Sequence, residues 1–144
     1  MLNPENVQTV KKYWDEFINN HDVTCANEIF TNDFLLYDPL SPEPVIGREV
    51  FVEMFGELLQ AFPDIHYTSE EQISEGNRIV IRWTMHATHE GNFLGIAPTG
   101  KTVSMSGVDM LYFSGGRIRA LRVEANLLGL VHQLQPIPNL QISC

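Results

Sequence analysis

Two ionisable side chains in the second half of the sequence, His89 and Asp109, stand at positions where a strand would place them among apolar neighbours. Alternate residues of a β-strand share a face. Between residues 78 and 90 one such row is apolar and ends at His89, and between 102 and 113 another has Asp109 as its one charge. A carboxyl group in an apolar site has a raised pKa, which brings it toward the range useful for proton transfer. The two residues therefore predict acid–base chemistry, with His89 as a base near neutral pH and Asp109 as its partner or as the acid.

Both residues also have a purely structural interpretation. A histidine at the rim of a sheet can hydrogen-bond a backbone carbonyl, and a buried aspartate can be bonded to an arginine or to a backbone amide. Gly107 shares a face with Asp109, and a missing side chain there either leaves room for a ligand or bends the sheet. The residues alone leave these alternatives open.

Most other site chemistries lack their residues in this sequence. It has no glycine-rich phosphate loop, no HExxH metal motif and no GxSxG nucleophile elbow. His86 and His89 are close in sequence, but strand alternation puts them on opposite faces, which disfavours a shared metal site. We therefore expect no metal and no cofactor, and a concave, mostly apolar pocket that carries a few polar groups.

Hydrophobic spacing indicates the elements that must hold this pocket. Helical periods predict helices over residues 4–20, 22–30, from Gly47 to Pro63, and over 127–134, with a brief extended run at 34–37. Alternating residues predict strands over 65–73, 78–90, 102–113 and 117–125, joined by glycine-containing hairpin turns. Helices followed by consecutive hairpin strands are typical of an α+β domain, in which helices lie on one face of a curved antiparallel sheet.

Length and charge narrow the class of protein further. The 144 residues predict one domain over 1–144, with a core over about 4–135 and a tail over 136–144. The net charge is −9, which disfavours binding to nucleic acid or to an anionic membrane surface. Residues 1–75 hold fifteen acidic and three basic side chains, whereas residues 76–144 hold three and six. The three late carboxylates are Glu90, Asp109 and Glu124, and only Asp109 stands alone in an apolar row.

Cysteine usage and the N-terminus indicate a location. Cys25 and Cys144 lie far apart and form neither a metal-binding nor a redox motif, so we expect two ordinary thiols in a reducing compartment. The N-terminus lacks the features of a signal peptide, and no stretch approaches the length of apolar sequence that crosses a membrane. These features predict a cytoplasmic protein.

An ordered set of short motifs resembles the SnoaL-like polyketide cyclases over about residues 7–135. The motifs are AFPD at 61–64, RWT at 82–84, HEGNFLGIAPTGK at 89–101, GRI at 116–118 and LGLVHQL at 128–134. The resemblance implies the cone fold of nuclear transport factor 2, in which a curved sheet wraps over N-terminal helices and encloses a central pocket. This expectation agrees with the pattern of helices and hairpins above.

The resemblance also implies a chemistry. Such cyclases close the last ring of an aromatic polyketide by an intramolecular aldol reaction without a cofactor, using a carboxylate near the end of the last strand. At that carboxylate's position this chain has Asn126, and Leu121 and Arg122 stand where a histidine and a tryptophan are common. An amide can orient a substrate or donate to an enolate, but it cannot take a proton at neutral pH. His89 and Asp109 match a histidine and an acidic position of the family.

We therefore predict a pocket protein that binds a small, apolar, polyketide-like carbonyl compound, with enol or aldol-type acid–base chemistry carried by Asp109, His89 and Asn126. The alternative is a non-catalytic ligand-binding protein or a structural homodimer module of the same fold. The resemblance implies a homodimer through the sheet face, where Arg82, Thr84 and His86 would lie. The predicted ligand contacts, several of which could equally be core residues, are Trp14, Phe55, Leu59, Trp83, Phe93, Ile96, Met105 and Leu121.

Overall fold

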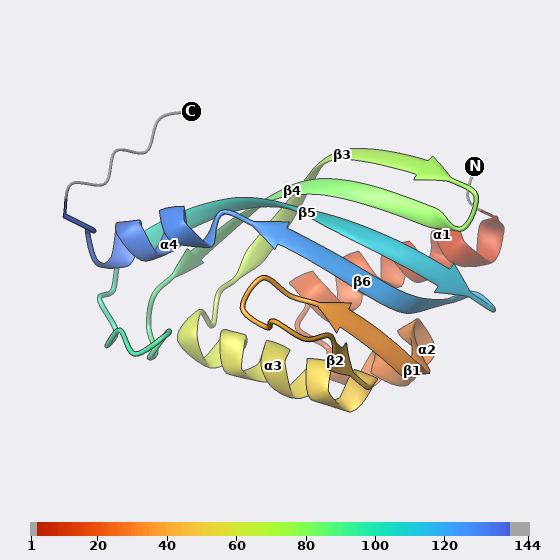
Figure 1. The fold of residues 1–144 in the computed structure, drawn as a ribbon, viewed down its shortest axis with the longest axis horizontal. Helices are drawn as coiled ribbons and strands as arrows, with labels where there is room; N and C mark the ends of the chain where they lie inside the picture. Colours follow the sequence, from red (N-terminus) through yellow and green to blue (C-terminus); the bar gives the residue numbers. More distant parts are fainter. Residues whose placement is uncertain (1–2, 139–144) are drawn as a thin grey trace.

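A curved sheet arches over helices in the computed structural model, which describes residues 3–138 (Figure 1). The helical segments are α1 (Pro4–Lys11), η1 (Lys12–Asn19), η2 (Val23–Cys25), α2 (Ala26–Ile29), α3 (Arg48–Ala61) and α4 (Leu127–Leu134). The strands are β1 (Phe30–Tyr37), β2 (Val45–Ile46), β3 (His66–Glu75), β4 (Arg78–Thr88), β5 (Thr102–Ser114) and β6 (Arg117–Ala125). The α+β architecture predicted from the sequence, a curved sheet over N-terminal helices, is confirmed.

The first helix begins where the sequence predicts and then changes its winding. Asn3 caps it by accepting a hydrogen bond from the backbone N–H of Asn6, and Pro4 occupies the first helical position. From Lys12 onward the helix widens into a π-helical segment, which ends where the N–H of Asn20 donates to the carbonyl of Asp15 at 3.1 Å. Two adjacent pairs of large side chains point inward from η1, and π-helical turns are frequent at functional sites. These buried residues are Tyr13, Trp14, Phe17 and Ile18.

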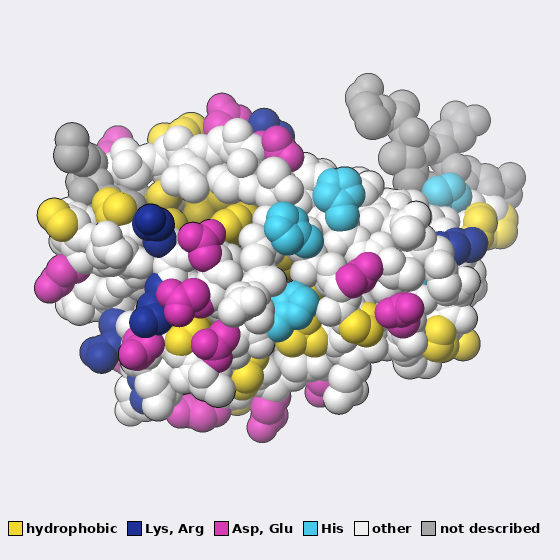
Figure 2. Space-filling model, turned by 180° about the vertical axis from the view of Figure 1, so that it is seen from behind, with side chains coloured by type: hydrophobic (Ala, Val, Ile, Leu, Met, Phe, Trp, Pro, Cys, Tyr) yellow, Lys and Arg dark blue, Asp and Glu magenta, His cyan; other side chains and the backbone are white. Residues whose placement is uncertain are grey.

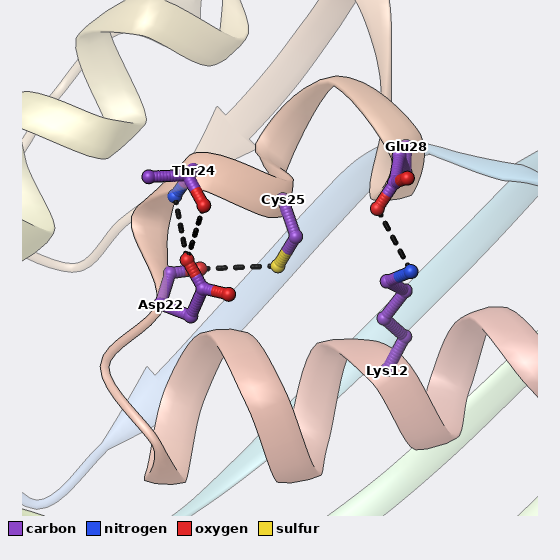
Figure 3. Close-up of polar contacts among 5 residues, drawn as sticks. All are labelled: Lys12, Asp22, Thr24, Cys25 and Glu28. Atoms are coloured by element: carbon purple, nitrogen blue, oxygen red, sulfur yellow. Dashed lines mark hydrogen bonds and ion pairs between the residues drawn. The ribbon is translucent and has the colours of Figure 1, made fainter.

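Polar contacts connect the segment of η2 and α2 to the first helix and stabilise the turn before it (Figure 3). Lys12 of η1 forms an ion pair with Glu28 of α2 at 2.8 Å, and the bond to Glu28 raises the pKa of Lys12. Asp22 accepts hydrogen bonds from the backbone and hydroxyl of Thr24. Cys25 is a free, buried thiol that lies 3.0 Å from the carbonyl of Asp22, and burial raises its pKa. Cys144 lies outside the described residues, as does the tail beyond residue 138.

The sheet has the order β2-β1-β6-β5-β4-β3, and the predicted hairpins connect β3 to β4 and β5 to β6. Two features were not predicted. The first strand covers Phe30–Tyr37 rather than only residues 34–37, and it runs parallel to β6, which is far away in the sequence. The two-residue strand β2 also extends the sheet. Neither feature has a local pattern, because the partners that define them come from other parts of the chain.

Strand alternation sorts the side chains of β4 as the sequence predicts. Ile79, Ile81, Trp83, Met85 and Ala87 are buried against the helices, while the intervening residues lie on the outer face. An aromatic cluster joins the first helix to α3 and β1, because Phe17 stacks on Phe51 and Phe55 and meets Phe30 edge-on at 5.2 Å. No helix of the described residues is long and apolar enough to cross a membrane.

The glycine in the middle of β5 is required by a close approach of two strands. Gly107 pairs with Trp83 of β4, and a Cβ atom at Gly107 would lie 2.4 Å from the Trp83 indole and 2.7 Å from the carbonyl oxygen of Glu124. The sequence left open whether the missing side chain at Gly107 makes room for a ligand or bends the sheet. In the structure the space is filled by the Trp83 side chain. The missing side chain lets the Trp83 ring lie over β5.

We predict that Gly107→Ala destabilises the protein by about 1–3 kcal/mol, because overpacking a filled site forces side chains and backbone to shift. The matched control is Gly56→Ala in α3, where a Cβ atom would meet nothing within 4 Å. This control should stabilise the helix by about 0.5–1 kcal/mol, since alanine is the better helix former. Urea unfolding of both variants measures the difference, and equal effects of the two substitutions would contradict the packing argument.

Candidate functional site

A cavity of about 590 Å³ lies between the inner face of the sheet and the helices. Its wall is mostly apolar and aromatic, with contributions from η1, α3, the strands β1 and β3 to β6, α4 and the loop before β5. Pockets of this size and character are typical of small-molecule sites. The apolar and aromatic lining residues include Trp14, Ile18, Leu36, Phe51, Met54, Phe55, Leu58, Tyr67, Trp83, Met85, Phe93, Met105, Leu121, Val123, Leu127 and Leu130.

Asp109 of β5 is the buried charge in this cavity, with 6% of its surface exposed. Its Oδ1 accepts a hydrogen bond from the indole N–H of Trp83 at 2.9 Å, and its Oδ2 accepts one from the hydroxyl of Tyr13 at 3.0 Å. Gly107 makes the first of these bonds possible, because it leaves space for the Trp83 ring. For the second, Tyr13 lies on the buried face of η1. Both carboxyl oxygens are therefore held in place.

Burial raises the pKa of Asp109 to about 6, and the hydrogen bonds from Trp83 and Tyr13 lower it only in part. Burial and the charge of Asp109 raise the pKa of Tyr13 well above its ordinary value, so Tyr13 stays a neutral donor. At neutral pH Asp109 is therefore mostly a carboxylate whose pKa lies close to the working pH. A group in this state is suited to act as a general base.

His89 is fully buried but does not line the cavity. Its Nδ1 accepts a hydrogen bond from the backbone N–H of Thr99 at 3.2 Å and lies 3.0 Å from the Thr99 hydroxyl. Its ring packs on Phe62, just after α3, with the ring centroids 5.6 Å apart. Within residues 3–138, His89 and Asp109 form no hydrogen bond with each other, and Asp109 lines the cavity whereas His89 does not. The chain leaves the sheet after Thr88, so the imidazole closes the base of the 89–101 loop instead of entering the cavity.

Asn126 is exposed and begins α4. Its side-chain oxygen accepts a hydrogen bond from the backbone N–H of Gly129 at 3.0 Å, which is the geometry of a helix N-cap. Its neighbours Ala125 and Leu127 line the cavity, whereas Asn126 does not. The structure therefore does not bring Asn126 together with Asp109 at the cavity wall.

Six of the eight predicted ligand contacts line the cavity, namely Trp14, Phe55, Trp83, Phe93, Met105 and Leu121. Leu59 and Ile96 do not line it. They are partly buried and pack against the core instead. Leu59 lies one helical turn after the lining residue Phe55 on α3.

The sequence analysis missed two tyrosines of the cavity, Tyr13 and Tyr67. Tyr13 lies between Val10 and Phe17 at helical spacing, so it shares the apolar face of the first helix, and the signal was present in the sequence. Tyr67 and Ser69 are the two half-buried residues of β3 and the rest of the strand is exposed, so its polar sequence gives only a weak pattern. Two further acidic residues, Asp38 and Glu57, also line the cavity.

A separate polar hollow of about 400 Å³ lies on the other side of the sheet. His66 and His86 line it and are paired across β3 and β4, and Figure 2 shows histidines gathered on one face. Asp64 also lines it, and two bonds from Thr88 at 2.7 Å lower the pKa of this carboxyl group. Among residues 3–138, no group of three or more His, Cys, Asp or Glu side chains is arranged to hold a metal ion.

Comparisons with known proteins agree with this geometry. The family model described as SnoaL-like polyketide cyclase matches residues 8–134. A proposed SnoaL-like polyketide cyclase from Jannaschia sp. CCS1 is 24% identical, with a TM-score of 0.86 over 96% of this chain and 99% of the other. AclR, a proposed hydroxylase from Streptomyces galilaeus, is 26% identical, with a TM-score of 0.82 over 95% of this chain and 85% of the other.

A further similar structure is a proposed polyketide cyclase from Acidithiobacillus ferrooxidans, at 24% identity and a TM-score of 0.82 over 94% of this chain and 97% of the other. No curated protein sequence matches this chain significantly. The likeness therefore extends over nearly the full length of chains of the same size.

The buried carboxyl group predicts a pH dependence of stability. The pKa of Asp109 in the folded protein, about 6, lies above its ordinary value of 3.8. The folded state therefore binds more protons than the unfolded state between these values, and Asp109 makes stability fall as the pH rises from about 4 to 6. Two pKa units correspond to about 3 kcal/mol.

We predict that Asp109→Asn removes this pH dependence, because the amide keeps the shape and can accept from Trp83 and donate to the Tyr13 oxygen. Relative to the wild type, the variant should gain about 2–3 kcal/mol in free energy of unfolding between pH 4 and pH 8. Urea titrations at both pH values measure this gain. Asp33→Asn, at an exposed position of β1, is the control, and the same gain in both variants would contradict the assignment.

Proposed function

Since the chain belongs to the SnoaL-like polyketide cyclase family, we propose that its cavity binds a small, largely apolar carbonyl compound and removes a proton from the carbon next to the carbonyl group. The single observation that carries this proposal is the buried carboxyl group of Asp109 in the wall of an apolar cavity. Its raised pKa and its two fixed oxygens match what a general base requires.

The walls support an apolar ligand. Aromatic and aliphatic side chains surround the space, and a cavity of about 590 Å³ suits a compound of two to four fused rings. Removal of such a compound from water supplies most of the binding free energy, at roughly 25 cal/mol for each Å² of buried apolar surface. The few polar groups then decide the orientation of the ligand.

The proposed step balances without a cofactor. Asp109 accepts the proton, the C–H bond breaks, and its electron pair moves toward the carbonyl oxygen to give an enolate. The carbon then attacks an electrophile within the same molecule or takes a proton back. The hydrogen bonds from Tyr13 and Trp83 orient the carboxylate before the step and stabilise its negative charge in the apolar site.

His89 and Asn126 act through position in this proposal. His89 closes the base of the 89–101 loop, which carries Phe93 to the cavity. Asn126 starts α4, which carries Leu127 and Leu130 to the cavity. Neither side chain contacts the proposed ligand.

The proposal names only the first step, proton removal, and not the final product. The reason is that one similar protein, AclR, is described as a proposed hydroxylase, whereas others are described as proposed cyclases. An aldol ring closure and a reaction that adds oxygen next to a carbonyl group both begin from the enolate. A non-catalytic ligand-binding protein is the second candidate, and Asn126 favours it, because the family's usual carboxylate is absent from that position.

We also propose a cytoplasmic homodimer that associates through the outer face of the sheet. On this face Arg82 pairs with Glu71 at 2.9 Å, and Thr84 and His86 lie beside it. The exposed ion pair contributes little to the stability of a single chain, so its value in this proposal is to set the register of two subunits.

The dimer predicts that Thr84→Lys gives a monomer, because two added charges would meet near the two-fold axis. Asn27→Lys, on the exposed side of α2, adds the same charge elsewhere and should leave a dimer. Analytical ultracentrifugation measures the masses. A monomeric wild type, or a dimeric Thr84 variant, would contradict this interface.

The catalytic proposal is tested with 2-tetralone, an apolar bicyclic ketone with acidic protons next to the carbonyl group. We expect the wild type to accelerate exchange of these protons in D₂O, followed by NMR, and Asp109→Asn to lower the rate constant at least about 100-fold, as loss of a general base does. The rate should rise from pH 4 to about 6, as Asp109 ionises, and then level off. Asp33→Asn serves as control.

Two outcomes separate the candidates. Ketone that stabilises the protein in a thermal-shift assay without any faster exchange would support the non-catalytic ligand-binding protein. Exchange that is equally fast in the wild type and in Asp109→Asn would remove Asp109 from the chemistry and would end the catalytic proposal.

A further inference from the structure

Tyr67 of β3 brings a phenol hydroxyl to the cavity that the protein itself does not use. The two donors deepest in the site, the Tyr13 hydroxyl and the Trp83 indole N–H, are both taken by Asp109. Within residues 3–138 the Tyr67 hydroxyl has no hydrogen-bond partner, and Tyr67 lines the cavity. Such a donor next to an apolar space is satisfied only when a ligand or water supplies an acceptor.

We propose that Tyr67 is a catalytic residue that donates a hydrogen bond to the carbonyl oxygen of the ligand. This inference rests on the function proposed above, and it adds the group that receives the charge which the base creates. Asp109 generates an enolate oxygen in a site whose other charged lining residues, Asp38 and Glu57, are also acidic. A negative oxygen formed there needs a donor, and Tyr67 offers an unbonded hydroxyl on the half-buried part of the wall, whereas the lining amides of Gln60 and Asn92 belong to exposed residues.

The backbone of Tyr67 is clamped in place by one side chain. The amide of Asn19, at the end of η1, donates to the carbonyl of Tyr67 at 2.9 Å and accepts from its N–H at 2.8 Å. These two hydrogen bonds connect the strand β3 to the helix that carries Tyr13. The proposed donor is therefore tied to the helix whose Tyr13 holds the base, as preorganisation requires.

Two tryptophans set the direction of the Tyr67 ring. It meets Trp83 nearly at right angles with centroids 4.9 Å apart, and Trp14 at 6.2 Å. Trp83 is the residue whose N–H holds Asp109, so one indole contacts the proposed donor with its ring and the base with its nitrogen. Asp109 and Tyr67 therefore lie on the same short stretch of cavity wall.

The hydroxyl keeps its proton at working pH. Burial and the negative charges of Asp109 and Asp38 raise the pKa of Tyr67 well above its ordinary value. A phenol in this state acts as a donor and not as a second base. In the step, the C–H electron pair moves to the carbonyl oxygen, the proton goes to Asp109, and the Tyr67 O–H stays intact while its hydrogen bond to that oxygen shortens.

The test compares Tyr67→Phe with Tyr112→Phe. Both substitutions remove one hydroxyl and keep the ring, but the Tyr112 hydroxyl contacts the sulfur of Met110 and does not line the cavity. The first measurement is the rate constant of 2-tetralone proton exchange in D₂O. Loss of one oxyanion donor lowers such rates about 10²–10³-fold, so we expect a loss of at least tenfold in Tyr67→Phe and no loss in Tyr112→Phe.

The second measurement is the infrared carbonyl stretch of bound, ¹³C-labelled 2-tetralone, which a merely structural role of Tyr67 would not move. A hydrogen bond lowers this frequency, so the wild type should show a lower value than the ketone in cyclohexane. Tyr67→Phe should return it toward the cyclohexane value while the ketone still binds. Tyr112→Phe should match the wild type.

The outcomes distinguish the two proposals. Unchanged exchange and an unchanged carbonyl frequency in Tyr67→Phe would overturn the role of Tyr67, whether or not Asp109→Asn is inactive. If exchange does not depend on Asp109, the proposed function fails, and a frequency shift that depends on Tyr67 would then still identify it as the ligand's hydrogen-bond partner. A wild-type frequency equal to that in cyclohexane would overturn the inference without any variant.

Discussion

The site depends on one constraint: the carboxyl group of Asp109, buried under the sheet, must receive hydrogen bonds from other side chains. Asp109 receives one from β4, through Trp83, and one from the first helix, through Tyr13. Each donor demands something of the backbone near it. Trp83 can lie over β5 only because Gly107 has no side chain, and Tyr13 points inward from the buried face of the first helix. Helix and sheet are thus joined across the cavity at Asp109.

The same carboxyl group gives the cavity its chemical character. Its burial raises its pKa to about 6. The folded protein therefore loses stability as this group ionises, and the carboxylate that results is a base whose pKa lies close to neutral pH. The rest of the wall is arranged around this group. Apolar side chains exclude water, and the Tyr67 hydroxyl, beside Trp83, makes no hydrogen bond within the described residues. The loop from 89 to 101 closes one side and is held at its base by His89.

Much of the fold follows from local sequence, and β6 and α4 show why. Both begin and end where predicted, at residues 117–125 and 127–134, because Gly115-Gly116 marks the turn before β6 and Asn126 caps α4. The pairing of β1 with β6 was beyond such reasoning, since it joins segments about ninety residues apart. The site divides in the same way. Asp109 and His89 were both placed in the interior from their rows, but alternation does not say which neighbours His89 meets, because β4 ends at Thr88.

The uneven charge of the chain gains a meaning from this division. Fifteen of the eighteen acidic residues belong to the first half, and of the three later ones only Asp109 is buried. The sequence by itself determined the α+β class, the faces of the strands and the presence of one carboxyl group among apolar residues, because these properties depend on neighbours in the chain. Tertiary structure alone decided which donors that carboxyl group meets, that His89 and Asn126 stay out of the cavity, and that Tyr13 and Tyr67 enter it. Such contacts join residues of different elements, and their geometry exists only when the sheet has closed over the helices.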